Sequence, residues 1–142
     1  DVCSSDLGMT GHQQNPTTGY NIKGDPAAKV NLEALCHALG INRVRVVDPY
    51  NLAECEQAVK EDLAAEEPSV IISRRPCVLL KYVKPKAPLR VDAEKCRSCK
   101  RCMGMGCPAI SMKEGKARID RTLCVGCGVC SQLCPFGAIA DH

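Results

Sequence analysis

Eight of the twelve cysteines in this 142-residue chain lie in two closely spaced motifs. The first motif is Cys96-x2-Cys99-x2-Cys102-x4-Cys107-Pro108, and the second is Cys124-x2-Cys127-x2-Cys130-x3-Cys134-Pro135. Three cysteines separated by two-residue gaps let one tight loop present three thiolates to three iron corners of a cube. The fourth cysteine of each motif lies too far around the turn, so we expect it to bind the other cube. The chemistry indicated is one-electron transfer through two [4Fe–4S] clusters.

This spacing predicts two sets of ligands that exchange one member. Cluster I is assigned to Cys96, Cys99, Cys102 and Cys134, and cluster II to Cys107, Cys124, Cys127 and Cys130. A disulfide framework is the alternative for a cysteine-rich chain, but cysteines so close together are poor partners for one another. Zinc is the alternative metal. A four-cysteine zinc site uses paired C-x2-C knuckles and needs neither a third cysteine nor a following Cys-Pro.

The repeat extends beyond the cysteines, because VDAEKC matches IDRTLC and CPAI matches CPFGAI. Each half is therefore predicted to be a strand, a cluster loop, a short helix and a strand, related by a pseudo-twofold axis. The extra residue in the first motif is expected to bulge locally. Four glycines of the motifs are expected to keep side chains away from the cubes and let backbone N–H groups face the sulfurs, although ordinary turn glycines would look the same. They are Gly104, Gly106, Gly126 and Gly128.

The apolar packing around the clusters is predicted to come from five aliphatic residues of the same region. They are Ile110, Ile119, Leu123, Val125 and Ile139. Upstream, helical periodicity predicts helices over about 27–39 and 52–65, and β-branched runs predict strands at 43–47 and 69–73. This order indicates part of a parallel α/β sheet with crossover helices.

The two helices are each predicted to carry an apolar stripe. The stripes consist of Leu32, Leu35, Cys36 and Leu39 in the first helix, and Leu52, Cys55, Val59 and Leu63 in the second. Cys36 and Cys55 lie on these stripes and are interpreted as core residues. Cys77 is interpreted as a buried thiol without a catalytic base.

Composition divides the chain into four segments. Residues 1–7, DVCSSDL, resemble a translated sequencing adapter and are left out of the fold argument, with a native loop as the alternative. Residues 8–80 are expected to be the C-terminal part of an α/β domain, and residues 81–90 a basic, proline-containing linker. Residues 91–142 are expected to be a small α+β ferredoxin-like domain holding both clusters.

Charge and hydropathy exclude several partners. The formal charge is +3, but two thiolate-ligated clusters add about −4, so the loaded chain is close to neutral. The basic balance is therefore no argument for nucleic acid. No run approaches the ~20 apolar residues of a membrane span, and no signal peptide is visible. A cytoplasmic protein without a membrane partner is expected.

Three upstream stretches resemble a known family: GMTGHQQNPTTG at 8–19, VRVVDPYNL at 44–52 and PSVIISRRPCVLL at 68–80. They look like the thiamine-diphosphate domain of 2-oxoacid:ferredoxin oxidoreductases. The indolepyruvate members are the most similar, because pyruvate and 2-oxoglutarate relatives tend to have glycine where His12 stands. The resemblance implies that Met9, Thr10 and Gly11 line the thiamine diphosphate and that His12 reaches the active site as a catalytic residue. A structural loop histidine is the alternative for His12.

The same resemblance implies an enzyme that decarboxylates a 2-oxoacid oxidatively with thiamine diphosphate, Mg²⁺ and coenzyme A. The clusters would pass the electrons to external ferredoxin, and a smaller beta subunit would be the partner. The Gly-Asp…Asn stretch that holds Mg²⁺ and the diphosphate in this family is expected upstream of Gly8. The chain as written is therefore expected to bind clusters but not thiamine diphosphate, and to be inactive alone. The alternatives are a free-standing ferredoxin with an N-terminal extension and a different 2-oxoacid oxidoreductase.

Overall fold

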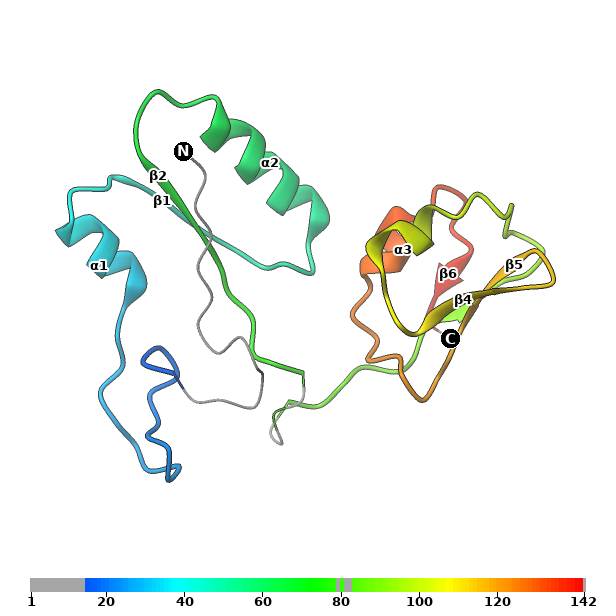
Figure 1. Ribbon diagram of the computed structural model, residues 1–142, viewed down its shortest axis with the longest axis horizontal. Helices are drawn as coiled ribbons and strands as arrows, with labels where there is room; N and C mark the ends of the chain where they lie inside the picture. Colours follow the sequence, from blue (N-terminus) through cyan, green and yellow to red (C-terminus); the bar gives the residue numbers. More distant parts are fainter. Residues whose placement is uncertain (1–14, 79, 81–82, 142) are drawn as a thin grey trace. The chain divides into compact units, whose positions relative to one another are not determined.

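The structure is a computed structural model that describes residues 15–78, 80 and 83–141. The chain divides into two compact units (Figure 1). The first unit runs to Pro49 and continues over Ala53–Val83, and the second contains Lys84–His142 together with Tyr50–Leu52. The division between Val83 and Lys84 lies inside the predicted linker at 81–90.

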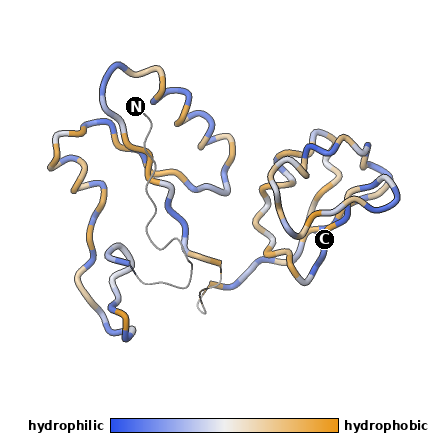
Figure 2. The backbone as a smooth tube through the Cα atoms, viewed as in Figure 1, coloured by the Kyte–Doolittle hydropathy of each residue, from blue (hydrophilic) through white to orange (hydrophobic). Residues whose placement is uncertain are grey.

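The first unit is a pair of parallel strands with two helices. Its elements are α1 (Leu32–Ala38), β1 (Arg43–Val47), α2 (Leu52–Leu63) and β2 (Ser69–Ser73). Strands β1 and β2 pair in parallel from Arg43 opposite Ser69 to Val47 opposite Ser73, with α2 as the crossover connection. The predicted parallel α/β arrangement is confirmed, and both strands have the predicted bounds. Figure 2 shows that the strand pair is mainly hydrophobic, whereas α2 alternates between hydrophilic and hydrophobic positions.

Helix α1 is shorter than predicted. It begins at Leu32 rather than near residue 27, because the side chain of Asn31 caps it by accepting a hydrogen bond from the backbone N–H of Ala34 at 3.1 Å. Gly40, with φ of +84°, ends it as predicted. Helix α2 ends at Leu63, two residues before the predicted bound at 65.

The predicted apolar stripes of both helices are only partly correct. Four of their members are half-buried and four are exposed; the half-buried ones are Leu32, Cys36, Leu52 and Cys55. Helix α1 has no buried residue, and α2 buries Ala58 and Asp62 while Val59 and Leu63 are exposed. Asp62 faces inward because β1 carries two arginines, whose Nε atoms lie 2.7 Å and 3.0 Å from its carboxylate oxygen. These ion-paired groups offset the desolvation of Asp62.

The second unit is built from two similar halves, as predicted. The first half contains β3 (Arg90–Val91), the 3₁₀ helix η1 (Arg101–Met105) and β4 (Ile110–Lys113). The second half contains β5 (Lys116–Ile119), α3 (Val129–Leu133) and β6 (Ile139–Ala140). Strand β3 pairs antiparallel with β6, and β4 pairs antiparallel with β5, so each half completes the other's sheet.

Backbone hydrogen bonds repeat this relation between the halves. The N–H of Asp92 donates to the carbonyl of Ala138, and the N–H of Asp120 donates to that of Ala109, both at 2.8 Å. Each aspartate carboxylate then accepts a backbone N–H from two residues further along the chain. These turns lead directly into the two cysteine loops. The VDAEKC and IDRTLC repeats therefore form equivalent turns.

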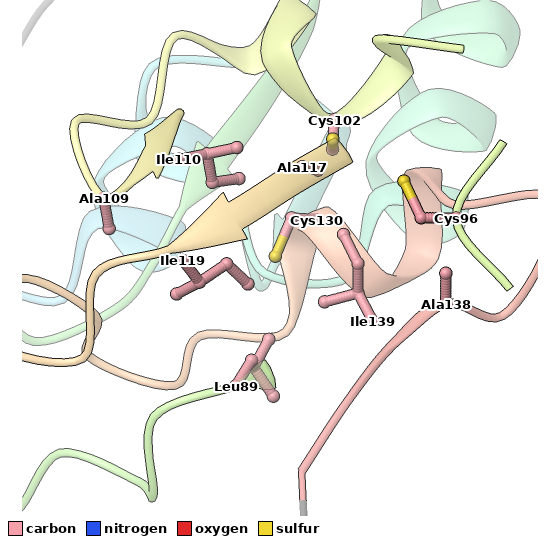
Figure 3. Packing of buried hydrophobic residues seen from close by; sticks show 10 residues of the cluster. All are labelled: Leu89, Cys96, Cys102, Ala109, Ile110, Ala117, Ile119, Cys130, Ala138 and Ile139. Carbon is pink, nitrogen blue, oxygen red and sulfur yellow. The ribbon is translucent and has the colours of Figure 1, made fainter. Parts of the chain in front are cut away.

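The core of the second unit contains small and aliphatic residues around three buried cysteines (Figure 3). Ile110, Ile119 and Ile139 are buried as predicted. Leu123 is 54% exposed, so its predicted core role is wrong: it belongs to the turn that enters the second loop rather than to a strand. No helix among the described residues is both long enough and apolar enough to cross a membrane.

Candidate iron–sulfur centre

The structure brings the four cysteines assigned to cluster I around one cavity of the second unit. Cys96, Cys99 and Cys102 come from one loop and the start of η1, while Cys134 enters from the residue that ends α3. The rest of the lining is apolar and basic. The apolar residues are Val91, Met112, Ala117, Phe136, Ala138 and Ile139, and the polar and basic ones are Arg97, Ser98, Lys100 and Arg101. In Figure 3, Cys96 and Cys102 lie near Ala117 and Ala138, while Cys130 is drawn nearer to Ile119 and Leu89.

The four cysteines assigned to cluster II are also neighbours. Burial raises the pKa of the Cys130 thiol to about 11, with further contributions from the negative charges of Cys127, Cys124 and Cys107. Cys130 lies on α3, and Cys107 comes from the other half of the unit. The first group has the equivalent arrangement, because Cys134 is its member from the other half.

The electrostatics of the two groups favour a cationic centre between the thiolates. Burial is also the main cause of the raised pKa of Cys102, followed among the cysteines by Cys134, Cys99 and Cys96. Four mutually repelling thiolates in a partly dry site need positive charge at their centre. Iron supplies that charge, so both donor sets fit [4Fe–4S] clusters.

Backbone N–H groups face the sulfurs, but the donors identified are not the predicted glycines. The N–H of Ala138 donates to Sγ of Cys134 at 3.3 Å. The N–H groups of Ala117 and Ser98 lower the pKa of Cys96. Hydrogen bonds of this kind stabilise the thiolate and raise the potential of a bound cluster.

The glycines of the motifs have other surroundings. A Cβ atom added to Gly104 or Gly106 would meet nothing within 4 Å. One added to Gly126 would meet the linker at Lys86 and Ala87. The extra residue of the first motif is accommodated by the 3₁₀ helix η1, which ends at Gly106 with φ of +68°, where the second half has an α-helix.

The cysteine groups differ from a site for a single metal ion and from a disulfide framework. Among the described residues, no three His, Cys, Asp or Glu side chains converge on a single ion. Thiolates that each bind a different iron of a cube do not need to converge in that way. No disulfide joins any two of the described cysteines.

The remaining cysteines stand outside both groups. Cys36, Cys55 and Cys77 are half-buried, and Cys55 donates a hydrogen bond to the carbonyl of Asp48 at 3.3 Å. Burial raises the pKa of Cys55, as expected for a packed thiol. The predicted thiamine-diphosphate contacts Met9, Thr10 and Gly11, the catalytic candidate His12, and residues 1–7 lie outside the described residues.

Two family models match the chain. The model of the 4Fe-4S binding domain matches residues 117–140, a range that includes Cys124, Cys127, Cys130 and Cys134. The model described as the thiamine pyrophosphate enzyme C-terminal TPP binding domain matches residues 5–73. The chain thus combines an iron–sulfur region with a region of the thiamine-diphosphate enzymes.

Curated relatives match nearly the whole chain. The Indolepyruvate oxidoreductase subunit IorA of Pyrococcus horikoshii is 42% identical over 139 residues, and that of Methanothermobacter thermautotrophicus is 39% identical over 132 residues. Both alignments cover 92% of this chain and 21% of the relative. Over most of its own length the chain is therefore similar to one part of these oxidoreductase subunits. It spans about a fifth of the length of these relatives. A shorter match, 43% identical over 56 residues, is to a dihydromethanopterin reductase (acceptor) of Methanosarcina mazei.

Sequence reasoning did not identify two features of this centre. The linker at Lys86–Ala87 lies against Gly126, and the Nζ atom of Lys116 donates to the carbonyl of Cys96 at 2.7 Å. Neither contact has a signal in the cysteine spacing. The sequence indicates the linker contact only by having glycine at position 126, where the first loop has Ser98.

Proposed function

We propose that this chain is the electron-transfer portion of a 2-oxoacid:ferredoxin oxidoreductase, with indolepyruvate as the substrate class. Its second unit holds two [4Fe–4S] clusters with the ligand sets assigned above, Cys107 and Cys134 each crossing to the other half. The observation that supports this most directly is the grouping of Cys134 with Cys96, Cys99 and Cys102 around one cavity. The match of residues 5–73 to thiamine-diphosphate enzymes supports the connection to 2-oxoacid chemistry.

Each part of the chain has a defined task in this proposal. Thiamine diphosphate, when bound, supplies the carbanion chemistry by which a 2-oxoacid loses CO2 and becomes a source of two electrons. The eight cysteines hold the clusters, and the isoleucine-rich core keeps water away from their buried sides. The electrons leave singly to external ferredoxin, and the acyl group is taken by coenzyme A. A smaller partner subunit completes the enzyme, as the subunit names of the relatives suggest.

The ligand sets are tested by anaerobic reconstitution of the chain with iron and sulfide. We expect about eight irons per chain, broad visible absorbance and the paramagnetic signals of two interacting reduced clusters. Cys134→Ser is expected to remove cluster I and Cys107→Ser cluster II, each leaving one cluster. Cys55→Ser is the matched control and should keep both. Stoichiometric zinc without colour, or loss of the same cluster in both variants, would contradict the assignment.

The substrate class is tested by exchange with a relative. This chain replaces the corresponding segment of the Pyrococcus horikoshii IorA subunit, which is then assayed with its own partner. We expect the hybrid to oxidise indolepyruvate in preference to pyruvate. His12→Gly should reduce the ratio of indolepyruvate to pyruvate oxidation while leaving the iron content of the hybrid unchanged. A hybrid that prefers pyruvate despite full cluster content would refute the substrate assignment but not the cluster assignment.

A further inference from the structure

The two cysteine loops share a backbone path but differ in charge. The first loop reads Cys96-Arg-Ser-Cys-Lys-Arg-Cys102, and the second reads Cys124-Val-Gly-Cys-Gly-Val-Cys130. The first therefore contains three cations between its cysteines, and the second contains none. Because both loops have the same spacing of their three cysteines, the difference in charge is not required by the ligand geometry. We call residues Lys95–Arg101 the basic loop.

Two positions of the basic loop adopt a backbone conformation that favours glycine. Ser98 and Lys100 have φ of +57° and +60°, and their counterparts Gly126 and Gly128 have φ of +67° and +81°. Left-handed backbone is unfavourable for residues with a side chain. Serine and lysine therefore stand where the second loop uses the unstrained residue. Strain of this kind at a non-glycine residue points to a role for its side chain.

The serine has an internal role, but the lysine does not. The hydroxyl of Ser98 donates to the carbonyl of Gly115, which fastens the basic loop to the turn between β4 and β5. Within the described part of the chain, the side chains of Arg97, Lys100 and Arg101 take part in no ion pair. All three are exposed and line the cavity of the cluster I cysteines. Their charges are therefore available to a partner.

Exposure of the ligands shows the same asymmetry. Cys99 is exposed, whereas the other seven ligands, all within the described residues, are buried or half-buried. In the second loop the linker at Ala87 covers Gly126, which is buried. The basic loop thus contains the most exposed of the eight cysteines, whereas the linker covers the second loop at Gly126.

Charge identifies the kind of partner. Cluster I with its four thiolates carries a charge of about −2. The positive charge of the basic loop is larger in magnitude than this, even though Lys95 is also paired with Asp92. Lys116, whose Nζ bonds the carbonyl of Cys96, adds a further positive charge. A cationic rim around an exposed redox centre attracts an anionic partner and steers its approach.

We propose that the basic loop is the docking surface for an acidic electron-carrier protein, with Lys100 as a positioning residue, and that electrons leave the chain through cluster I. This rests on the proposed function and names the exit of that electron path. The transfer moves one electron from the reduced cluster, which returns to its oxidised state, to the oxidised metal centre of the carrier, which is reduced. No bond forms or breaks.

The test uses Lys100→Gly in the reconstituted chain, whose clusters are first reduced with dithionite that is then removed, because glycine removes the side chain and relieves the backbone. The probe is an acidic ferredoxin, and the readouts are its rate of reduction and its affinity at low and high salt. We expect unchanged iron content, an equal or higher thermal midpoint, and a rate at low salt reduced about 3- to 10-fold. At high salt the rates of ferredoxin reduction by wild type and variant should become equal, because salt screens the charge of the lysine.

Arg121→Ala is the matched control, since Arg121 is an exposed cation that precedes the second loop. It should leave the rate unchanged. An equal loss in Arg121→Ala, no loss in Lys100→Gly, or an unchanged rate with a ferredoxin whose surface carboxylates are neutralised would each overturn the proposal. Loss of iron in Lys100→Gly would also overturn it, because the lysine would then be structural. A wild-type chain that assembles no clusters would instead refute the proposed function.

Discussion

Replacing Gly126 with alanine is predicted to destabilise the second unit by more than the same replacement at Gly106. A Cβ atom on Gly126 would lie 2.5 Å from the carbonyl oxygen of Ala87 and 2.8 Å from Cβ of Lys86. A Cβ atom on Gly106 would meet nothing within 4 Å. The two glycines have nearly the same φ, +67° and +68°, so they differ mainly in the presence of the linker.

The expected magnitude follows from two contributions. A left-handed backbone conformation costs a non-glycine residue about 1–2 kcal/mol, and the free energy of unfolding of both variants falls by this amount. Displacing packed atoms costs about 1–3 kcal/mol more, and only Gly126→Ala loses it. In a unit of this size each kcal/mol moves the thermal midpoint by about 4–8 °C, so the variants should differ by roughly 5–20 °C.

The assay follows the loss of visible cluster absorbance on heating, at one scan rate because cluster loss is irreversible. Limited digestion with trypsin gives a local readout, since the bond after Lys86 should be cut faster in Gly126→Ala than in Gly106→Ala. Equal midpoints for the two variants, or equal cutting after Lys86, would refute the packing of the linker on Gly126.

Three further predictions concern both units. Asp62→Ala should destabilise the first unit by about 2 kcal/mol in chemical denaturation, because two arginines of β1 lose their shared acceptor, whereas Glu56→Ala removes only an exposed pair with Lys60 and should change little. Backbone N–H groups hold the pKa of Asp92 below its usual range, and hydrogen bonds from the hydroxyl and N–H of Thr122 do the same for Asp120. The stabilisation that these two carboxylates provide is therefore present above the ordinary carboxyl pKa and is lost as the pH falls through the lowered values. The double variant Asp92→Asn, Asp120→Asn should accordingly lose less thermal stability than wild type between about pH 6 and pH 3. Calorimetry of the chain with thiamine diphosphate and Mg²⁺ should show no tight binding, and a tight Mg²⁺-dependent signal would contradict that expectation.

The elements that sequence predicted well are those fixed by local chemistry. The run RVRVV is β-branched and alternating, and it forms β1 with the predicted bounds. The α1 start was missed because Asn31 caps the helix five residues later than the periodicity suggested. The buried face of α2 was missed because hydrophobicity alone favoured Val59 and Leu63, whereas two arginines on β1 attract Asp62. A partner charge from another element cannot be seen in a helix's own sequence.

For the cluster centre, the spacing of the cysteines by itself indicated the metal, the two loops and the exchange of Cys107 and Cys134. The prediction rests on the expectation that three thiolates within seven residues reach only one cube, so that the fourth is left for the other. Only the tertiary structure decided which loop faces outward. The linker lies against Gly126, and the hydroxyl of Ser98 donates to the carbonyl of Gly115; both are contacts between segments that are far apart in sequence. The cysteine spacing likewise does not show that Cys99 is the one exposed member of the eight motif cysteines.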